Sequence, residues 1–222
     1  SSTKFKKKIS IIGAGNLASH LLPALENGGF AIGEIYSRNI KNAESLSSRL
    51  YQGKAQSHLD FSGSNSELFL VAVCDEAIPE IATNIILPSN AIIAHTSGTT
   101  SIDTLKKHEH RGVFYPIQTF SKNRKINFEK VPIVIESSDV YTKETLVALA
   151  DGLKSNYTFL NSEERKSIHL AAVFACNFTN HLLGIAQEIL DREDLEFSIL
   201  APLIEETIAK AISSGNPYLT QT

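Results

Sequence analysis

The stretch KISIIGAGNLASHLL, residues 8–22, decides the fold class. A short apolar run leads through two glycines into apolar residues at helical spacing. Gly13 permits a tight turn after a buried strand, and Ala18 is small enough for the following helix to lie close to that strand. The stretch therefore predicts the first strand, turn and helix of a βαβ unit.

The same alternation continues to about residue 161. We expect strands at residues 8–15, 30–38, 67–75, 90–98, 112–116, 131–137 and 156–160, and helices at 16–29, 42–50, 76–85 and 141–155. From Ser162 onward only helical patterns remain, at 162–190 and 197–215. The pattern predicts an α/β fold: a doubly wound, mostly parallel Rossmann sheet in residues 1–161, then a smaller all-α domain in residues 162–222.

Composition excludes several classes of protein. Of the 222 residues 42% are hydrophobic and 20% charged, and the net charge of −3 favours neither nucleic acid nor anionic lipid as a partner. We expect the lysines at 4, 6, 7 and 8 to be a solvated segment that leads into the first strand. We find no apolar stretch long enough to span a bilayer. Cys74 and Cys176 lack metal-ligand spacing, so we expect small buried residues in a cytoplasmic protein without a metal site.

The glycine turn predicts a dinucleotide site. Gly13 and Gly15 follow the strand directly, so a diphosphate could approach the backbone at Gly15 and the amide groups of Asn16 and Leu17. The alternative is a purely structural turn. The second strand ends in Ser37, Arg38 and Asn39 without a carboxylate, and Glu34 lies too early to bind a ribose. A cation and small polar groups suit the 2′-phosphate of NADP, unless Arg38 is merely a surface arginine.

Residues after the later strands are further candidates, because ligands collect at the carboxyl ends of parallel strands. Val73, Cys74 and Asp75 follow the central strand and could form a wall of the cofactor pocket, although Asp75 could instead cap the next helix. Ser97, beside His95, could orient a substrate, or both could simply stabilise a turn.

The motifs IIGAGNLA (11–18), VAVCDEAI (71–78), AHTSG (94–98), YPIQTF (115–120) and HLAAVFACNFTNHL (169–182) together resemble a family of Rossmann-like NADP oxidoreductases whose helical C-terminal domain has no known function. That family is similar to pyrroline-carboxylate reductase and to deazaflavin-dependent NADP oxidoreductases, within the 6-phosphogluconate-dehydrogenase-like superfamily. The resemblance implies an NADP domain, a helical domain for dimerisation and a pocket between the two.

The chain departs from these relatives at three places. Tyr115 precedes Pro116 where members commonly have a histidine, and Val173 stands four residues before Asn177 where hydroxyacid dehydrogenases have a catalytic lysine. The resemblance therefore disfavours a hydroxyacid dehydrogenase mechanism. The chain ends at Thr222, where relatives continue, so we expect their last element to be absent or disordered here.

The stretch 169–182 is a helix with an unusual polar side. When residues 165–183 are placed at about 100° per residue, one sparsely polar front falls within a sector of roughly 80°, with Asn177 about 40° further round. The residues of that front are Arg165, His169, Val173, Cys176 and Asn180. Histidine, asparagine and cysteine suit a partly buried cleft wall, so we infer that His169 is a general acid and that Asn177 or Asn180 orients the substrate. A dimer interface or interdomain seam with structural polar groups is the alternative.

The sequence thus favours an NADP-dependent oxidoreductase, a homodimer through its C-terminal helices, that moves hydride between nicotinamide and a small carbonyl, imine or alcohol in an interdomain cleft. The alternative is an NADP-binding regulatory or sensor protein without catalysis.

Overall fold

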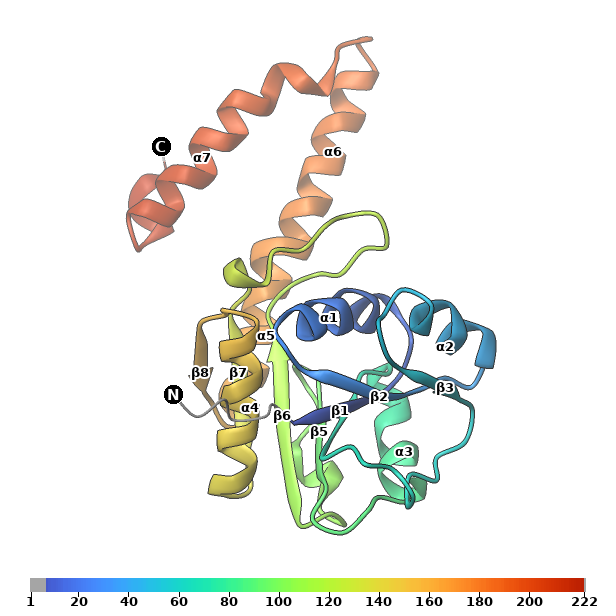
Figure 1. Cartoon of the computed structure of the whole chain (residues 1–222). Helices are drawn as coiled ribbons and strands as arrows, with labels where there is room; N and C mark the ends of the chain where they lie inside the picture. Colours follow the sequence, from blue (N-terminus) through green and yellow to red (C-terminus); the bar gives the residue numbers. More distant parts are fainter. Residues whose placement is uncertain (1–6, 222) are drawn as a thin grey trace. The chain divides into compact units, whose positions relative to one another are not determined.

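The computed structural model describes residues 7–221, and its sheet confirms the predicted α/β class. Eight strands lie in the order β3-β2-β1-β4-β5-β6-β7-β8, parallel throughout except where β7 runs against β6 (Figure 1). Their bounds are β1 Lys8–Ile12, β2 Ala31–Tyr36, β3 Lys54–Gln56, β4 Leu68–Val71, β5 Ile92–His95, β6 His110–Pro116, β7 Ile133–Ser137 and β8 Tyr157–Phe159. The order reverses between β1 and β4, which is where doubly wound sheets bind ligands.

Helices cover both faces of this sheet. The helices of the chain are α1 Asn16–Asn27, α2 Ile40–Ser47, α3 Ile78–Asn84, α4 Val140–Gly152, α5 Ser162–Ala172, α6 Thr179–Asp191 and α7 Ala201–Ser213. One core joins α1, α2 and α4 to side chains such as Ile9 and Leu70, and the other joins α3 to Phe69 and Ile93. Neighbouring residues of one strand thus point into opposite cores, as the two-residue period of a strand requires.

A long connection lies at the carboxyl ends of the parallel strands, which is the end of the sheet where ligands bind in such folds. Because β6 and β7 are antiparallel, with Pro116 opposite Ile133, residues 117–132 leave and re-enter the sheet at the same edge. The carbonyl of Ser121 accepts a hydrogen bond from the ring of His20 in α1, 2.7 Å away. The connection is therefore held to the helix that follows the glycine turn.

Several elements differ from the sequence-based expectation. Strand β3 was missed because it has only three residues, Lys54–Gln56. Strand β4 ends at Val71 rather than continuing to residue 75, so the chain leaves the sheet before Cys74. The expectation that both cysteines are buried is wrong: Cys74 and Cys176 are free and exposed.

The basic N-terminal segment differs as well. Lys7 is not simply solvated, because its ammonium group contacts Glu67 at 3.7 Å and lies 4.4 Å from the centre of the Tyr141 ring. Lys4 and Lys6 lie outside the described residues.

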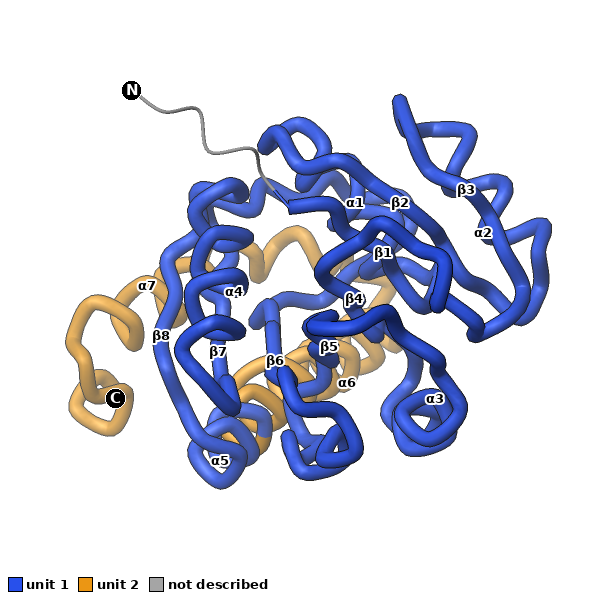
Figure 2. The backbone as a smooth tube through the Cα atoms, turned by 60° about the horizontal axis from the view of Figure 1, so that its bottom comes forward, with its two compact units in different colours: residues 1–169 blue, residues 170–222 orange. Residues whose placement is uncertain are grey.

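The chain divides into two compact units, residues 1–169 and residues 170–222, which Figure 2 colours separately. The division falls within α5, whose residues 162–169 belong to unit 1 and include the buried side chain of Arg165, while the domain boundary near residue 161 stays a prediction.

The helical segment Ser162–Asp191 corrects the expectation about membrane-spanning length. Its 30 residues include a window of mean hydropathy 1.3, which is long and apolar enough to cross a bilayer by length and composition alone. Polar residues within it, His169 and Asn177 among them, would be costly in the centre of a bilayer.

Candidate nucleotide site

The glycine turn after β1 is shaped by a close approach between two strands. Gly13 has φ +122°, and a Cβ there would lie 2.9 Å from the carbonyl carbon of Ala72 and overlap its oxygen. The Gly13 amide donates to the carbonyl of Tyr36 at 2.8 Å. Glycine is therefore required at position 13 by both backbone conformation and space.

Gly15 is required neither by its backbone conformation nor by packing. It caps α1 with an extended conformation, φ −83°, that any residue adopts, and a Cβ there would meet nothing within 4 Å. The first amide groups of α1, at Asn16 and Leu17, have no partner within the helix by geometry. Open space in front of a helix start with free amide groups fits a diphosphate, which the N-terminal end of the helix dipole also attracts.

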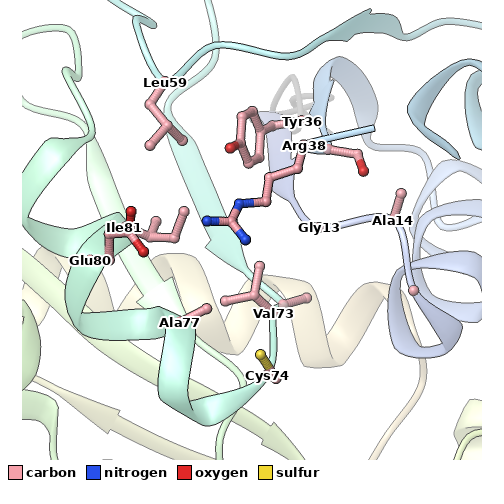
Figure 3. A pocket seen from close by; sticks show the side chains of 13 residues that line it. Gly13, Ala14, Tyr36, Arg38, Leu59, Val73, Cys74, Ala77, Glu80 and Ile81 are labelled. Carbon is pink, nitrogen blue, oxygen red and sulfur yellow. The ribbon is translucent and has the colours of Figure 1, made fainter. Parts of the chain in front are cut away.

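A cavity of about 370 Å³ opens beside this turn (Figure 3). Of the cofactor residues expected from the sequence, it is lined by Gly13, Gly15, Ser37, Arg38, Val73 and Cys74. Asn16, Leu17, Asn39 and Asp75 do not line it. The residues that sequence reasoning missed are Ala14, Tyr36, Leu59, Ala72, Ala77, Glu80 and Ile81. The site therefore combines the turn, the tip of β2 and the segment from β4 into α3.

The tip of β2 offers a cation to the cavity. Figure 3 shows the guanidinium group of Arg38 extending into the cavity toward Val73. No carboxylate comes from this strand end, because Glu34 accepts hydrogen bonds from the hydroxyls of Ser10 and Ser64 elsewhere in the sheet. Asn39 caps α2, where its side chain accepts from the amide of Lys41.

Asp75 has another role than the helix capping considered above. It is the first residue of a 3₁₀ turn whose N-cap is Cys74, and its carboxylate accepts a hydrogen bond from the hydroxyl of Thr99 at 2.8 Å. Asp75 therefore links the loop after β4 to the loop after β5 instead of capping a helix.

The loop after β5 is held by internal hydrogen bonds. The Ser97 hydroxyl is buried and accepts from the amides of Thr99 and Thr100, at 3.1 and 3.0 Å. A Cβ at Gly98 would lie 2.7 Å from the ring of Tyr115, so the phenol lies directly against this loop. Burial and the charge of Asp75 raise the pKa of Tyr115, which keeps the phenol a neutral hydrogen-bond donor.

Beneath this loop lie two buried basic side chains. The Nδ1 atom of His95 accepts from the Ser97 amide at 3.1 Å, and burial, followed by the charge of Arg165, lowers the pKa of His95 to about 4. Arg165 is fully buried and donates to the carboxylate of Glu136 and to the carbonyl of Thr100. A neutral imidazole and a paired guanidinium thus support the loop from inside.

The predicted polar front of the C-terminal helix is not a continuous stripe. Arg165 is buried within unit 1, whereas His169, Asn177 and Asn180 are exposed. Residues Val173–Phe178 form a π-helix, whose wider turns hold an extra residue. The regular rotation assumed from the sequence is therefore wrong beyond Val173, and the catalytic roles of His169, Asn177, Asn180 and Ser97 stay predictions.

Comparisons with known proteins agree with this architecture. The profile of the Rossmann-like domain matches residues 2–118, and that of the domain of unknown function DUF2520 matches residues 131–222. The crystal structure of BF3122 from Bacteroides fragilis, a candidate NADP oxidoreductase by name, is 38% identical, with 98% of this chain and 84% of that chain covered and a TM-score of 0.85.

More distant structures share the fold. Protein TM1727 from Thermotoga maritima is 26% identical, with 96% of this chain and 82% of that chain covered and a TM-score of 0.75. A 1-pyrroline-5-carboxylate reductase from Streptococcus pyogenes is 12% identical, with 95% and 80% covered and a TM-score of 0.73, which shows the fold alone. No curated protein matches the chain.

Alanine substitutions at the two glycines should have different effects, one on ligand binding and the other on the free energy of unfolding. Gly15→Ala should leave the free energy of unfolding within about 0.5 kcal/mol of wild type but weaken NADP⁺ binding roughly tenfold or more, because the methyl group fills the space that a diphosphate needs. Gly13→Ala should instead lower the free energy of unfolding by about 2 kcal/mol or more. Urea denaturation and titration calorimetry measure the two effects, and unchanged NADP⁺ affinity in Gly15→Ala would exclude diphosphate binding at this turn.

Because His95 is buried, we expect the free energy of unfolding to depend on pH in the acidic range. Its pKa falls from 6.5 to about 4 on folding, so between these values the unfolded chain binds a proton that the folded chain lacks. The free energy of unfolding should therefore decrease as the pH falls through this window. His95→Asn keeps an acceptor for the Ser97 amide without titrating, so urea denaturation at about pH 7 and about pH 5 should show a smaller loss than in wild type. Equal losses would contradict the neutral buried imidazole.

Proposed function

The chain belongs to the Rossmann-like family whose C-terminal half is DUF2520, and from this membership we propose that it is an NADP-dependent oxidoreductase. The observation that carries the proposal is the open helix start at Gly15 beside a cavity that contains Arg38. Bound NADP would supply the hydride chemistry, and the chain would supply binding, orientation and proton transfer.

The preference for NADP over NAD rests on the tip of β2. Arg38 and Ser37 line the cavity, and no carboxylate from this strand end does. A carboxylate there would bind ribose hydroxyls and repel a 2′-phosphate, whereas a guanidinium group attracts a phosphate and matches its geometry. Arg38 would therefore hold the 2′-phosphate.

The catalytic part of the proposal assigns roles to residues outside this cavity. His169 would protonate the reduced centre as a general acid, Asn177 or Asn180 would orient the substrate, and Ser97 would contribute from the loop after β5. The substrate would be a small carbonyl or imine, or an alcohol in the reverse direction, in the cleft expected from the sequence. The imidazole of His169 is exposed and therefore accessible to a substrate, and an imidazole can donate a proton through a ring nitrogen.

A second candidate is an NADP-binding regulatory protein without catalysis. Val173 stands where relatives with known chemistry carry a lysine, and the phenol of Tyr115 lies against Gly98 where members of the family commonly have a histidine. The two candidates share the cofactor and differ only in turnover.

Turnover distinguishes them directly. Purified protein mixed with NADPH and a panel of imines, keto acids and aldehydes should oxidise NADPH steadily with one substrate class, as followed by absorbance. His169→Ala should lower that turnover roughly a hundredfold without changing NADPH affinity, because it removes a proton donor. Arg38→Ala should instead weaken NADPH binding roughly tenfold and abolish the preference over NADH.

Other outcomes would revise the proposal. Tight NADPH binding without turnover across the panel would favour the regulatory protein. If His169→Ala loses folding or dimerisation instead of turnover, the histidine is structural.

We also propose that the protein is a cytoplasmic homodimer formed through unit 2. None of the described residues of α6 and α7 is buried, and these helices expose Leu182 and Leu203 at 63% and 64%. Leucine, isoleucine and threonine side chains of α6, α7 and Leu200 line an apolar groove of about 320 Å³. Isolated helices gain little stability unless an apolar face is covered, and a second copy offers the same apolar surface. Free, exposed cysteines suit a reducing compartment.

Sedimentation velocity tests the dimer. Wild type should sediment at twice the mass of the chain, and Leu203→Asp should shift it toward the monomer, because a buried charge opposes association. Tyr51→Asp, which changes an exposed aromatic residue in unit 1, should stay dimeric. A monomeric wild type, or a chain that dissolves only in detergent, would contradict the proposal.

A further inference from the structure

The nucleotide cavity contains a negatively charged side chain, which the phosphates of a dinucleotide would repel. Among the described residues that line the cavity, Glu80 is the acidic one. It is exposed, and no hydrogen bond or ion pair joins its carboxylate to another described residue. Its acceptor oxygens are therefore available to a ligand.

Glu80 lies on the wall opposite Arg38. In Figure 3 it is beside Ile81 on α3, and the guanidinium group of Arg38 extends toward this wall from the tip of β2. Ala77 and Val73 complete the wall with small apolar surface. A planar aromatic base is the kind of group that stacks on a guanidinium plane on one side and on aliphatic side chains on the other.

Glu80 also has a reason to be in this helix without any ligand. It lies in the first turn of α3, where the helix dipole favours a negative charge. Glu76 lies one turn earlier, in the preceding 3₁₀ turn, and is exposed too, but it does not line the cavity. Glu76 is therefore a matched control for the loss of a negative charge near this helix start.

We propose that Glu80 selects the base of the bound dinucleotide, by accepting a hydrogen bond from the exocyclic amino group of adenine stacked between Arg38 and Ile81. The inference rests on the proposed NADP binding and extends it to the base. A carboxylate has only acceptors, and the adenine amino group is a donor. In hypoxanthine a carbonyl oxygen replaces that amino group, so two acceptors would face each other.

Titration calorimetry with NADP⁺ and with its hypoxanthine analogue, nicotinamide hypoxanthine dinucleotide phosphate, tests this on the full chain. Wild type should bind NADP⁺ about tenfold more tightly, as expected for one hydrogen bond to a charged group at an exposed site. Glu80→Gln should reduce the preference to about twofold or less, because its amide can accept from adenine or donate to hypoxanthine. Glu80→Ala should also lose the preference, by weakening NADP⁺ binding, and Glu76→Gln should keep it.

The other outcomes separate this inference from the proposed function. Equal binding of the two dinucleotides by wild type would overturn the role of Glu80 and leave NADP binding intact. A preference that persists in Glu80→Ala would overturn it as well. If Glu80→Gln strengthens both ligands equally, the carboxylate only repels phosphate and does not read the base. Binding of neither dinucleotide would overturn the proposed function together with the inference.

Discussion

The contact between Gly13 and the carbonyl of Ala72 is the constraint on which the site depends. It lies where β1 and β4 are neighbours although many residues separate them in the chain, and only a residue without a side chain allows the two backbones to approach so closely. The approach places the turn after β1 beside the segment that leads into α3. The cavity exists because these two backbone segments and the tip of β2 meet at one edge of the sheet.

Local patterns were sufficient to predict the parts of the molecule that local chemistry determines. The glycine turn, the alternation of strands and helices, and the helical C-terminal region follow from residue spacing and turn chemistry, and the structure confirms this fold class. Arg38 could be found because the end of β2 has a fixed place relative to the turn. Glu80 and Leu59 could not, because their part in the cavity depends on how α3 and a loop pack around it.

Long-range packing explains the remaining differences. The sequence places Arg165 with His169 on the wall of a partly buried cleft, whereas its partners Glu136 and Thr100 lie far away in the sequence, and a buried guanidinium needs such partners. The π-helical turn at Val173–Phe178 has no simple sequence signal, so a uniform rotation along the helix was a reasonable but wrong assumption. Cys74 is exposed because β4 ends three residues before it.

The antiparallel pairing of β6 and β7 has a consequence for how such proteins diversify. Residues 117–132 begin and end at the same end of the sheet, and Phe128 and Val131 anchor them in the core, so the exposed residues 121–125 between can change in length and composition without moving a strand. That end is the one at which the nucleotide site lies. Changes in this connection can therefore alter which substrate a protein of this architecture binds, while the nucleotide-binding framework stays the same. Distant relatives could acquire different substrates in this way.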